Sequence, residues 1–264
     1  WYPNDAVEST TIWRYMDLGK FLSLIQTSQL WFSHTSKFDD PYEGRYSKEI
    51  AEDIQREKWG IEEPSEEDTG FFMEDDADDY VSCWNRKESQ SVALWELYNE
   101  GNNGVAVKST VEGLKSSPVE LPEDEIEYQI EFGKVKYHVA GDEPRGYYAP
   151  IFTKRDIFEF ENEYRAVMTV FNSLDSVDIE GVKIVPEVGI GLTVDLNTLI
   201  DGVYISRGAG SYLEDVIERR VLKFLLRIAL LYHIAGNPSG TEGSVIHWKI
   251  KPRCLFNNIL DVLE

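Results

Sequence analysis

The sequence contains little positive charge, and this shortage excludes several kinds of partner. Its 264 residues include 26 lysines and arginines against 48 aspartates and glutamates, which gives a net charge of −22 at pH 7. A field of that sign repels nucleic acids and anionic membranes unless basic residues are concentrated in one place, and no basic cluster occurs. We therefore expect no membrane association and no basic groove for a nucleic acid.

Cysteines and long apolar runs are also scarce. Cys83 and Cys254 belong to no CxxC or CxxH pattern, so neither a zinc site nor a disulfide framework is expected. The longest apolar stretch, 221–234, is interrupted by Lys223 and Arg227 and falls short of the ~20 residues that span a bilayer. A cytoplasmic location is predicted. The chain starts with tryptophan, which leaves open whether a leader has been removed.

Familiar catalytic motifs are missing as well. The chain has no GxxxxGK[ST] phosphate loop, no GxGxxG after a strand, no HExxH and no GxSxG. Its four histidines stand alone in the sequence and are interpreted as structural. The common nucleotide-binding loops, zinc proteases and serine hydrolases are therefore not indicated, and no metal requirement is expected.

What is present is a mixture of short helical and strand patterns with enough apolar residues, 42%, to build a core. Strands are predicted at 11–15, 30–34, 80–85, 105–107, 128–132, 134–137, 158–171, 182–186, 202–206 and 245–251, and helices at 18–26, 47–59, 91–98 and 211–233. Few long helices separate the strands, which favours mainly antiparallel pairing. We expect a single α+β domain over 1–264, with mixed, mainly antiparallel sheets flanked by helices.

One short segment carries much of the acidity. Residues 62–79 (EEPSEEDTGFFMEDDADD) hold ten of the acids. Acid-rich runs repel themselves and resist packing, so a solvated loop inserted at about 60–79 is predicted. A calcium loop is the alternative, but its D-x-D-x-D-G spacing is missing.

A regular charge pattern marks the predicted strand at 158–171. The segment FEFENEYRAVM places three glutamates at every second position and then Arg165 in the same phase. On a strand these side chains share one face, which is either solvated or the acidic floor of a site. Arg165 either neutralises Glu163 structurally or positions that carboxylate for a substrate hydroxyl. The other two glutamates of this face are Glu159 and Glu161.

Two loops and several tryptophans are further candidates for ligand binding. The loop FDDPYEG (38–44) is either a tight turn whose aspartates cap backbone amides or a divalent-cation site. Glycine-flanked amides of SRGAG (206–210), with Arg207 beside them, suit an anion at a helix start. Trp84, like the tryptophans at 13 and 95, either stacks on a nucleotide ring or belongs to the core.

Three blocks of the sequence resemble the domain-of-unknown-function 2971 family of bacteria and archaea. They run in order from residue 13 to residue 167 and comprise WRYMDLGKFLSLIQTSQLWFSHTSKFDDPYEG (13–44), VSCWN (81–85) with Trp95, Tyr98 and the following GVA (104–106), and ENEYRAV (161–167). The family name implies no reaction.

A second resemblance does imply one. Arg14 stands in the first predicted strand, Ser82 in a later one and Glu163 in a still later one, an order similar to that of ADP-ribosyltransferases of the Arg-Ser-Glu type. The resemblance implies split sheets, with NAD as co-substrate. It further implies that Arg14 fixes the NAD phosphates or ribose, Ser82 supports the nicotinamide ribose, and Glu163 binds its 2′-hydroxyl. Glu161 would activate the acceptor, and Trp84 and Arg207 are further candidates for NAD binding.

The residue types suit that chemistry. Breaking the nicotinamide glycosidic bond develops positive charge on the ribose, which a fixed carboxylate stabilises. A guanidinium grips a diphosphate through paired hydrogen bonds. The leading hypothesis is therefore an ADP-ribosyltransferase-like enzyme, a toxin or phage-defence effector by analogy, whose protein or nucleic-acid acceptor stays open.

Two alternatives stay open beside this hypothesis. One is a non-catalytic ligand-sensing or protein-interaction module, in which a structural charge network forms from Arg14, Glu43, Glu163 and Arg165. The other is a metal-dependent hydrolase, with ligands from Asp39, Asp40, Glu161 and Glu163. A buried charge needs a partner in each case, either a protein group or a ligand.

Overall fold

The fold of the chain is given by a computed structural model. It describes residues 2–40, 42–63, 78–98, 103–121, 126–139, 145–146, 148–171, 182–185, 188–206, 217, 219 and 249–251. The predicted helix at 211–233, most of the acidic run at 62–79 and the SRGAG loop beyond Ser206 lie outside these residues. Within them, no helix has the length and apolarity that a membrane crossing requires.

The predicted fold class is confirmed, because the described elements form an α+β structure with mainly antiparallel strand pairing. The chain divides into two compact units, each assembled from three separate segments. The first unit comprises Trp1–Val7, Leu30–Arg86 and Val119–Leu192, and the second comprises Glu8–Gln29, Lys87–Pro118 and Thr193–Glu264. The single-domain organisation and the split sheets of an ADP-ribosyltransferase stay predictions.

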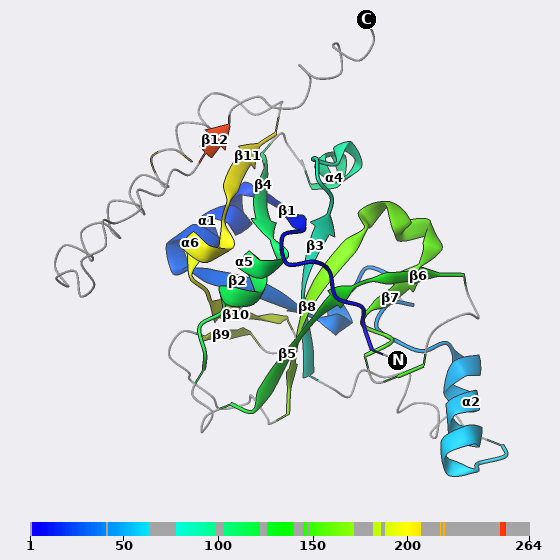
Figure 1. Ribbon diagram of the computed structural model, residues 1–264. Helices are drawn as coiled ribbons and strands as arrows, with labels where there is room; N and C mark the ends of the chain where they lie inside the picture. The colour runs from blue at the N-terminus through cyan, green and yellow to red at the C-terminus, as the bar shows by residue number, and fades with distance from the viewer. Residues whose placement is uncertain are drawn as a thin grey trace, which may run out of the picture. The chain divides into compact units, whose positions relative to one another are not determined.

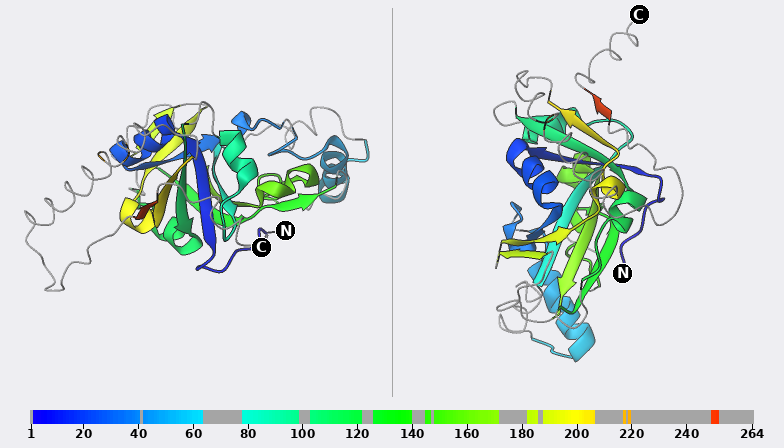
Figure 2. Two further views of the ribbon diagram at one scale, coloured as in Figure 1. Left: turned by 90° about the horizontal axis from the view of Figure 1, so that it is seen from above. Right: turned by 90° about the vertical axis from the view of Figure 1, so that its left-hand side faces the viewer.

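The first unit is built around strand β8 (Glu163–Val170), whose eight residues are all buried. β8 pairs antiparallel with β3 (Asp78–Arg86) on one side and with β5 (Tyr128–Lys134) on the other (Figure 1). β5 and β8 also lie side by side in the two further views of Figure 2. Because all of β8 is buried, its charged residues Glu163 and Arg165 need partners inside the protein.

Shorter elements complete the first unit. β2 (Gln29–His34) lies between β3 and β10 (Gly189–Thr193), and β10 pairs with β9 (Val182–Val185). The remaining elements are the parallel pair β6 (Lys136–His138) and β7 (Thr153–Arg155), the 3-10 helices η1 (Thr35–Lys37) and η3 (Asp156–Glu161), and helix α2 (Lys48–Trp59). Ser47 caps α2 by accepting a hydrogen bond from the amide of Ile50, and Gly60 ends it in the left-handed region.

The second unit contains antiparallel strands with helices packed beside them. β4 (Gly104–Thr110) pairs with β1 (Thr11–Asp17) and with β11 (Gly202–Ile205), and β11 pairs in parallel with β12 (Lys249–Lys251). Its helices are α1 (Leu18–Thr27), α4 (Val92–Tyr98), α5 (Val111–Ser116) and α6 (Leu196–Leu199). Trp13, Tyr15 and Trp95 are core residues here, as the core interpretation of these tryptophans predicted.

Most of the predicted elements lie where the sequence placed them, but the segment 158–162 was wrongly predicted as strand. The expected strand at 158–171 begins only at Glu163, because residues 156–161 form the 3-10 helix η3. Asn162 ends η3 in the left-handed region with a φ of 40°. Glu159 and Glu161 therefore do not continue the strand face of Glu163 and Arg165, and Glu159 is exposed.

Candidate functional site

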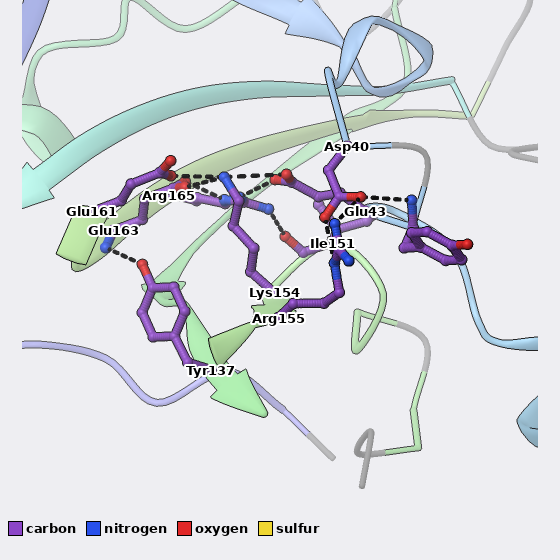
Figure 3. Close-up of polar contacts among 10 residues, drawn as sticks. Asp40, Glu43, Tyr137, Ile151, Lys154, Arg155, Glu161, Glu163 and Arg165 are labelled. Atoms are coloured by element: carbon purple, nitrogen blue, oxygen red, sulfur yellow. Dashed lines mark hydrogen bonds and ion pairs between the residues drawn. The ribbon is translucent and has the colours of Figure 1, made fainter. Parts of the chain in front are cut away.

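A buried group of five charged side chains forms at the start of β8. It consists of Glu43, Lys154, Glu161, Glu163 and Arg165, and we call it the charge cluster. Glu163 and Arg165 come from β8, Lys154 from β7, Glu161 from the end of η3 and Glu43 from the FDDPYEG loop. Figure 3 shows the two cationic side chains between the three carboxylates.

Arg165 is fully buried and has three different partners. Its Nε donates to Glu163 Oε2 at 2.7 Å, one Nη donates to Glu43 Oε1, and the other donates to the carbonyl oxygen of Ile151. The guanidinium also lies 5.2 Å from the centroid of the Phe38 ring. A buried guanidinium requires this degree of pairing, because an unpaired ion in the interior is strongly destabilising.

Lys154 is the second cation and contacts all three glutamates. Its Nζ lies 2.7 Å from Glu161 Oε2, 3.0 Å from Glu163 Oε1 and 3.2 Å from Glu43 Oε2. The ammonium also lies 4.7 Å from the centroid of the Phe158 ring. Lys154 is 10% exposed and Glu161 is 19% exposed, the largest value in the charge cluster. Glu161 is therefore the member most accessible to a ligand.

A second ion pair continues the cluster toward the surface. Arg155 donates to both carboxylate oxygens of Asp40, each at 3.0 Å. Asp40 Oδ1 also accepts from the amide of Tyr42, and the Asp40 carbonyl accepts from the amide of Glu43. The tight-turn interpretation of the FDDPYEG loop is thus confirmed at Asp40. Asp39 has no role in the charge cluster.

The environment separates the pKa values of the two neighbouring glutamates. Burial, followed by the hydrogen bond with Glu163, raises the pKa of Glu161 to about 7 despite Lys154. Burial would also raise the pKa of Glu163, but the charge of Arg165, with Lys154 and Glu161, lowers it well below its ordinary value. The surroundings therefore favour the ionised form of Glu163 and the protonated form of Glu161.

Further contacts tune the same group. Burial opposes the charge on Lys154, but the carboxylates of Glu163 and Glu43 raise its pKa above the ordinary value. Tyr137 accepts a hydrogen bond from the amide of Glu163 at 2.8 Å, and burial together with the Glu163 charge raises the pKa of its hydroxyl. Three carboxylates facing two cations leave one negative charge, which a proton on Glu161 neutralises.

The β3–β8 register separates two of the predicted site residues from Glu163. Ser82 lies opposite Ala166 and Trp84 lies opposite Tyr164, whereas Asn85 lies opposite Glu163. Side chains alternate along a strand, so Ser82 and Trp84 point to the face away from Glu163. Ser82 Oγ accepts from Trp84 Nε1 at 3.1 Å. Trp84 is 2% exposed, so the core interpretation of its ring is confirmed.

Of the remaining predicted site residues, some lie together in the charge cluster and others do not. Glu161 and Glu163 are brought together around Lys154. Arg14 lies on β1 in the second unit and is half-buried. Arg207 lies outside the described residues. The sequence placed Glu163 and Arg165 side by side correctly, and the structure gives that pair a third member, Glu43.

Lys154 and Tyr137 were missed by sequence reasoning. The sequence around them gives little indication of a functional role. Lys154 stands in the short stretch TKRD after apolar residues, and Tyr137 stands in a three-residue strand. Two adjacent bases, Lys154 and Arg155, in so acidic a chain are the feature that indicates carboxylate partners. Only folding shows which carboxylates they contact.

The proposed metal ligands are engaged in other contacts. Glu161 and Glu163 bind Lys154, and Asp40 binds Arg155. Across the part of the chain that the structure describes, no group of three or more His, Cys, Asp or Glu residues is arranged to hold a metal ion. The geometry therefore gives the hydrolase alternative no support.

Comparisons with protein-family models, with curated proteins and with solved structures found no match for this chain. Both family resemblances accordingly stay predictions. The contacts and charges of the charge cluster are the basis on which a function can be proposed.

Proposed function

We propose that the protein is an enzyme in which Glu161 is the acid–base group and ionised Glu163 stabilises the transition state, with NAD as co-substrate. The observation that carries this proposal is the opposite displacement of the two pKa values around a shared contact with Lys154. Neighbouring carboxyls whose pKa values are pushed apart are typical of catalytic acid–base assignments. A pKa of about 7 also places Glu161 close to the optimum for proton transfer at neutral pH.

The proposed reaction uses the two carboxylates differently. The bond between the nicotinamide nitrogen and ribose C1′ breaks, and nicotinamide leaves with the bonding electron pair. Ionised Glu163 stabilises the positive charge that develops on the ribose. An acceptor oxygen or nitrogen bonds to C1′ and gives its proton to ionised Glu161. The acid–base role of Glu161 rests on the geometry. The choice of NAD rests only on the order of Arg14, Ser82 and Glu163 in the sequence, because Ser82 points to the face of β3 away from Glu163.

The test is to incubate the purified protein with NAD and to measure the rate of nicotinamide release by chromatography. Glu161→Gln is expected to slow release by about 10²–10⁴-fold, because an amide neither accepts nor returns the proton. Glu159→Gln is the matched control, since Glu159 lies on the same turn but is exposed. It should leave the rate unchanged. A protein that neither binds NAD nor releases nicotinamide would exclude the proposal.

The second candidate function is a non-catalytic ligand-sensing or protein-interaction module. The observation that favours it is the saturation of Glu163, whose two oxygens are bound by Arg165 and Lys154. In that case the charge cluster is a structural anchor for the FDDPYEG loop. The nicotinamide assay distinguishes the two functions, because an enzyme releases nicotinamide and loses that turnover in Glu161→Gln, whereas a non-catalytic module releases none even as the wild type.

A further inference from the structure

The turn that carries Glu161 is held by the last residues of β3. Asn162 adopts a φ of 40°, which residues other than glycine seldom do, although asparagine tolerates it best. Its Nδ2 donates to the carbonyl oxygen of Arg86, and its Oδ1 accepts from Arg86 Nη2 at 2.6 Å. The Arg86 amide in turn donates to the Asn162 carbonyl at 2.8 Å. Backbone and side chain of Asn162 are therefore both fixed by one residue.

Asn85 fixes the preceding residue of the turn. Its Nδ2 donates to the carbonyl oxygen of Glu161, and Asn85 lies directly opposite Glu163 in the β3–β8 register. Asn85 is 4% exposed. The backbone of Glu161 and the strand that carries Glu163 are thus connected through the same asparagine.

This arrangement is not what stability alone would favour. Asn85 Oδ1 and Arg86 Nε are buried without a hydrogen-bond partner among the described residues. Unpaired buried polar atoms destabilise a fold, as does a left-handed backbone at a non-glycine residue. Asn85 and Arg86 each have a buried polar atom without a hydrogen-bond partner in the described part of the chain, and Asn162 has a disfavoured φ. These three unfavourable features, gathered at the end of β3 and in the turn, indicate that the turn geometry serves a purpose other than stability.

We infer that Asn162, together with Asn85 and Arg86, positions Glu161 so that its carboxyl lies against Glu163 and Lys154. This inference rests on the proposed function only in that Glu161 is the acid–base group. The carboxyl of Glu161 faces Lys154 and Glu163, with Glu43 and Arg165 behind them. A shift of the turn would carry Glu161, the most exposed member of the charge cluster, outward into water.

The experiment is a titration of the Glu161 carboxyl by NMR on the full chain without NAD. Glutamates are labelled with ¹³C at the carboxyl, and the Glu161 signal is assigned by its loss in Glu161→Gln. Asn162→Gly keeps the left-handed backbone but removes both side-chain hydrogen bonds to Arg86. We expect its Glu161 midpoint to fall from about 7 by ~1 unit or more toward the ordinary range.

The matched control is Ser28, the other non-glycine residue with a positive φ, 55°, among those described. Ser28→Gly should leave the Glu161 midpoint unchanged. A midpoint that also stays unchanged in Asn162→Gly would overturn the inference. Arg86→Gln is the second variant if Asn162→Gly does not fold. It removes the guanidinium that donates to Asn162 Oδ1 but keeps the two hydrogen bonds made by the Arg86 backbone, and an unchanged midpoint there would have the same meaning.

The titration tests the positioning role and the nicotinamide assay tests the enzyme function, so either proposal can be wrong without the other. If the midpoint falls but no nicotinamide is ever released, the positioning role stands and the proposed enzyme function does not. If nicotinamide is released but the midpoint does not move, the enzyme function stands and the turn is purely structural.

Discussion

At the scale of single residues, Arg165 decides how the charge cluster holds together. It is fully buried, and its guanidinium joins Glu163 of its own strand to Glu43 of a distant loop. Buried ion pairs contribute little net stability when they replace apolar packing, but they become costly once one partner is removed. The charge cluster should therefore be sensitive to single substitutions.

Arg165→Met tests this sensitivity. The change leaves Glu43 and Glu163 with Lys154 as their only cation, so the free energy of unfolding should fall by about 3–5 kcal/mol. Urea denaturation followed by circular dichroism measures the loss. Arg56→Met is the control, because Arg56 contacts Glu52 and Asp53 on the exposed side of α2 and should cost less than ~1 kcal/mol. Equal losses in both variants would show that the charge cluster is not structural.

Glu161 should make stability fall as the pH rises toward neutrality. Its pKa in the folded protein is about 7, above the ordinary 4.5, so the folded state keeps a proton that the unfolded chain releases between these values. The free energy of unfolding therefore decreases from pH 4.5 to pH 7, on the order of 2 kcal/mol for this largely buried group.

Glu161→Gln should remove that decrease and leave the protein more stable than the wild type at pH 8. Urea denaturation at pH 5 and pH 8 provides the measurement, with Glu159→Gln as the exposed control. Glu163 has the opposite sign, because its lowered pKa adds stability that is lost only as the pH falls below the ordinary range. A wild-type protein that is equally stable at both pH values would contradict the expected role of Glu161.

At the scale of elements, β5 approaches the N-terminal segment so closely that only glycine fits at position 133. Gly133 lies opposite Arg165 in the β5–β8 register. A Cβ added there would lie 2.5 Å from Pro3 Cβ and 3.3 Å from Phe152 Cε1. The chain passes beside β5 at this point, and Lys134 donates its amide to the Asn4 carbonyl at 2.8 Å.

Gly133→Ala should therefore lower the free energy of unfolding by about 1–3 kcal/mol through overpacking. Thermal and urea denaturation measure the effect. Pro3→Gly removes the atoms that would clash, so the double variant Pro3→Gly/Gly133→Ala should recover most of the loss. If the two changes were simply additive, the close approach of Pro3 would not be the cause.

The elements themselves differ in how well their patterns predicted them. α1 and α2 carry clear caps at Asp17 and Ser47, and both begin where those residues indicate. η3 was missed because the alternating phenylalanines and glutamates at 158–161 match the pattern of a strand with one buried face. In the structure none of the residues of η3 is fully buried. Asn162, whose left-handed backbone separates η3 from β8, could not be recognised from the alternation of polar and apolar residues.

At the scale of the whole molecule, the net charge of −22 opposes compaction. Like charges repel in the folded state more than in the expanded chain, and salt screens that repulsion over about 10 Å at 0.1 M. The described surface does contain compensating pairs, such as Arg145 with Asp53 and Glu57. Such exposed pairs do not offset an excess of 22 acids over bases.

We expect added NaCl to raise the midpoint of thermal unfolding at pH 8 by roughly 2–6 °C. The measurement is a series of melting curves at increasing NaCl. Near the pI of about 4.5 the net charge vanishes, so the same series should show a much smaller change. A midpoint that does not respond to salt at pH 8 would mean that self-repulsion does not limit the stability of this chain.

The sequence by itself determined the charge, the α+β class, most element positions and the neighbourhood of Glu163 and Arg165. These follow from composition and from short-range periodicity, which act between residues close in the chain. Only the tertiary structure decided that Arg165 binds Glu43, that Lys154 collects three carboxylates and that Ser82 points away from Glu163. Ion pairs and strand faces depend on proximity in space and on register, and neither is encoded in the spacing of residues along the chain.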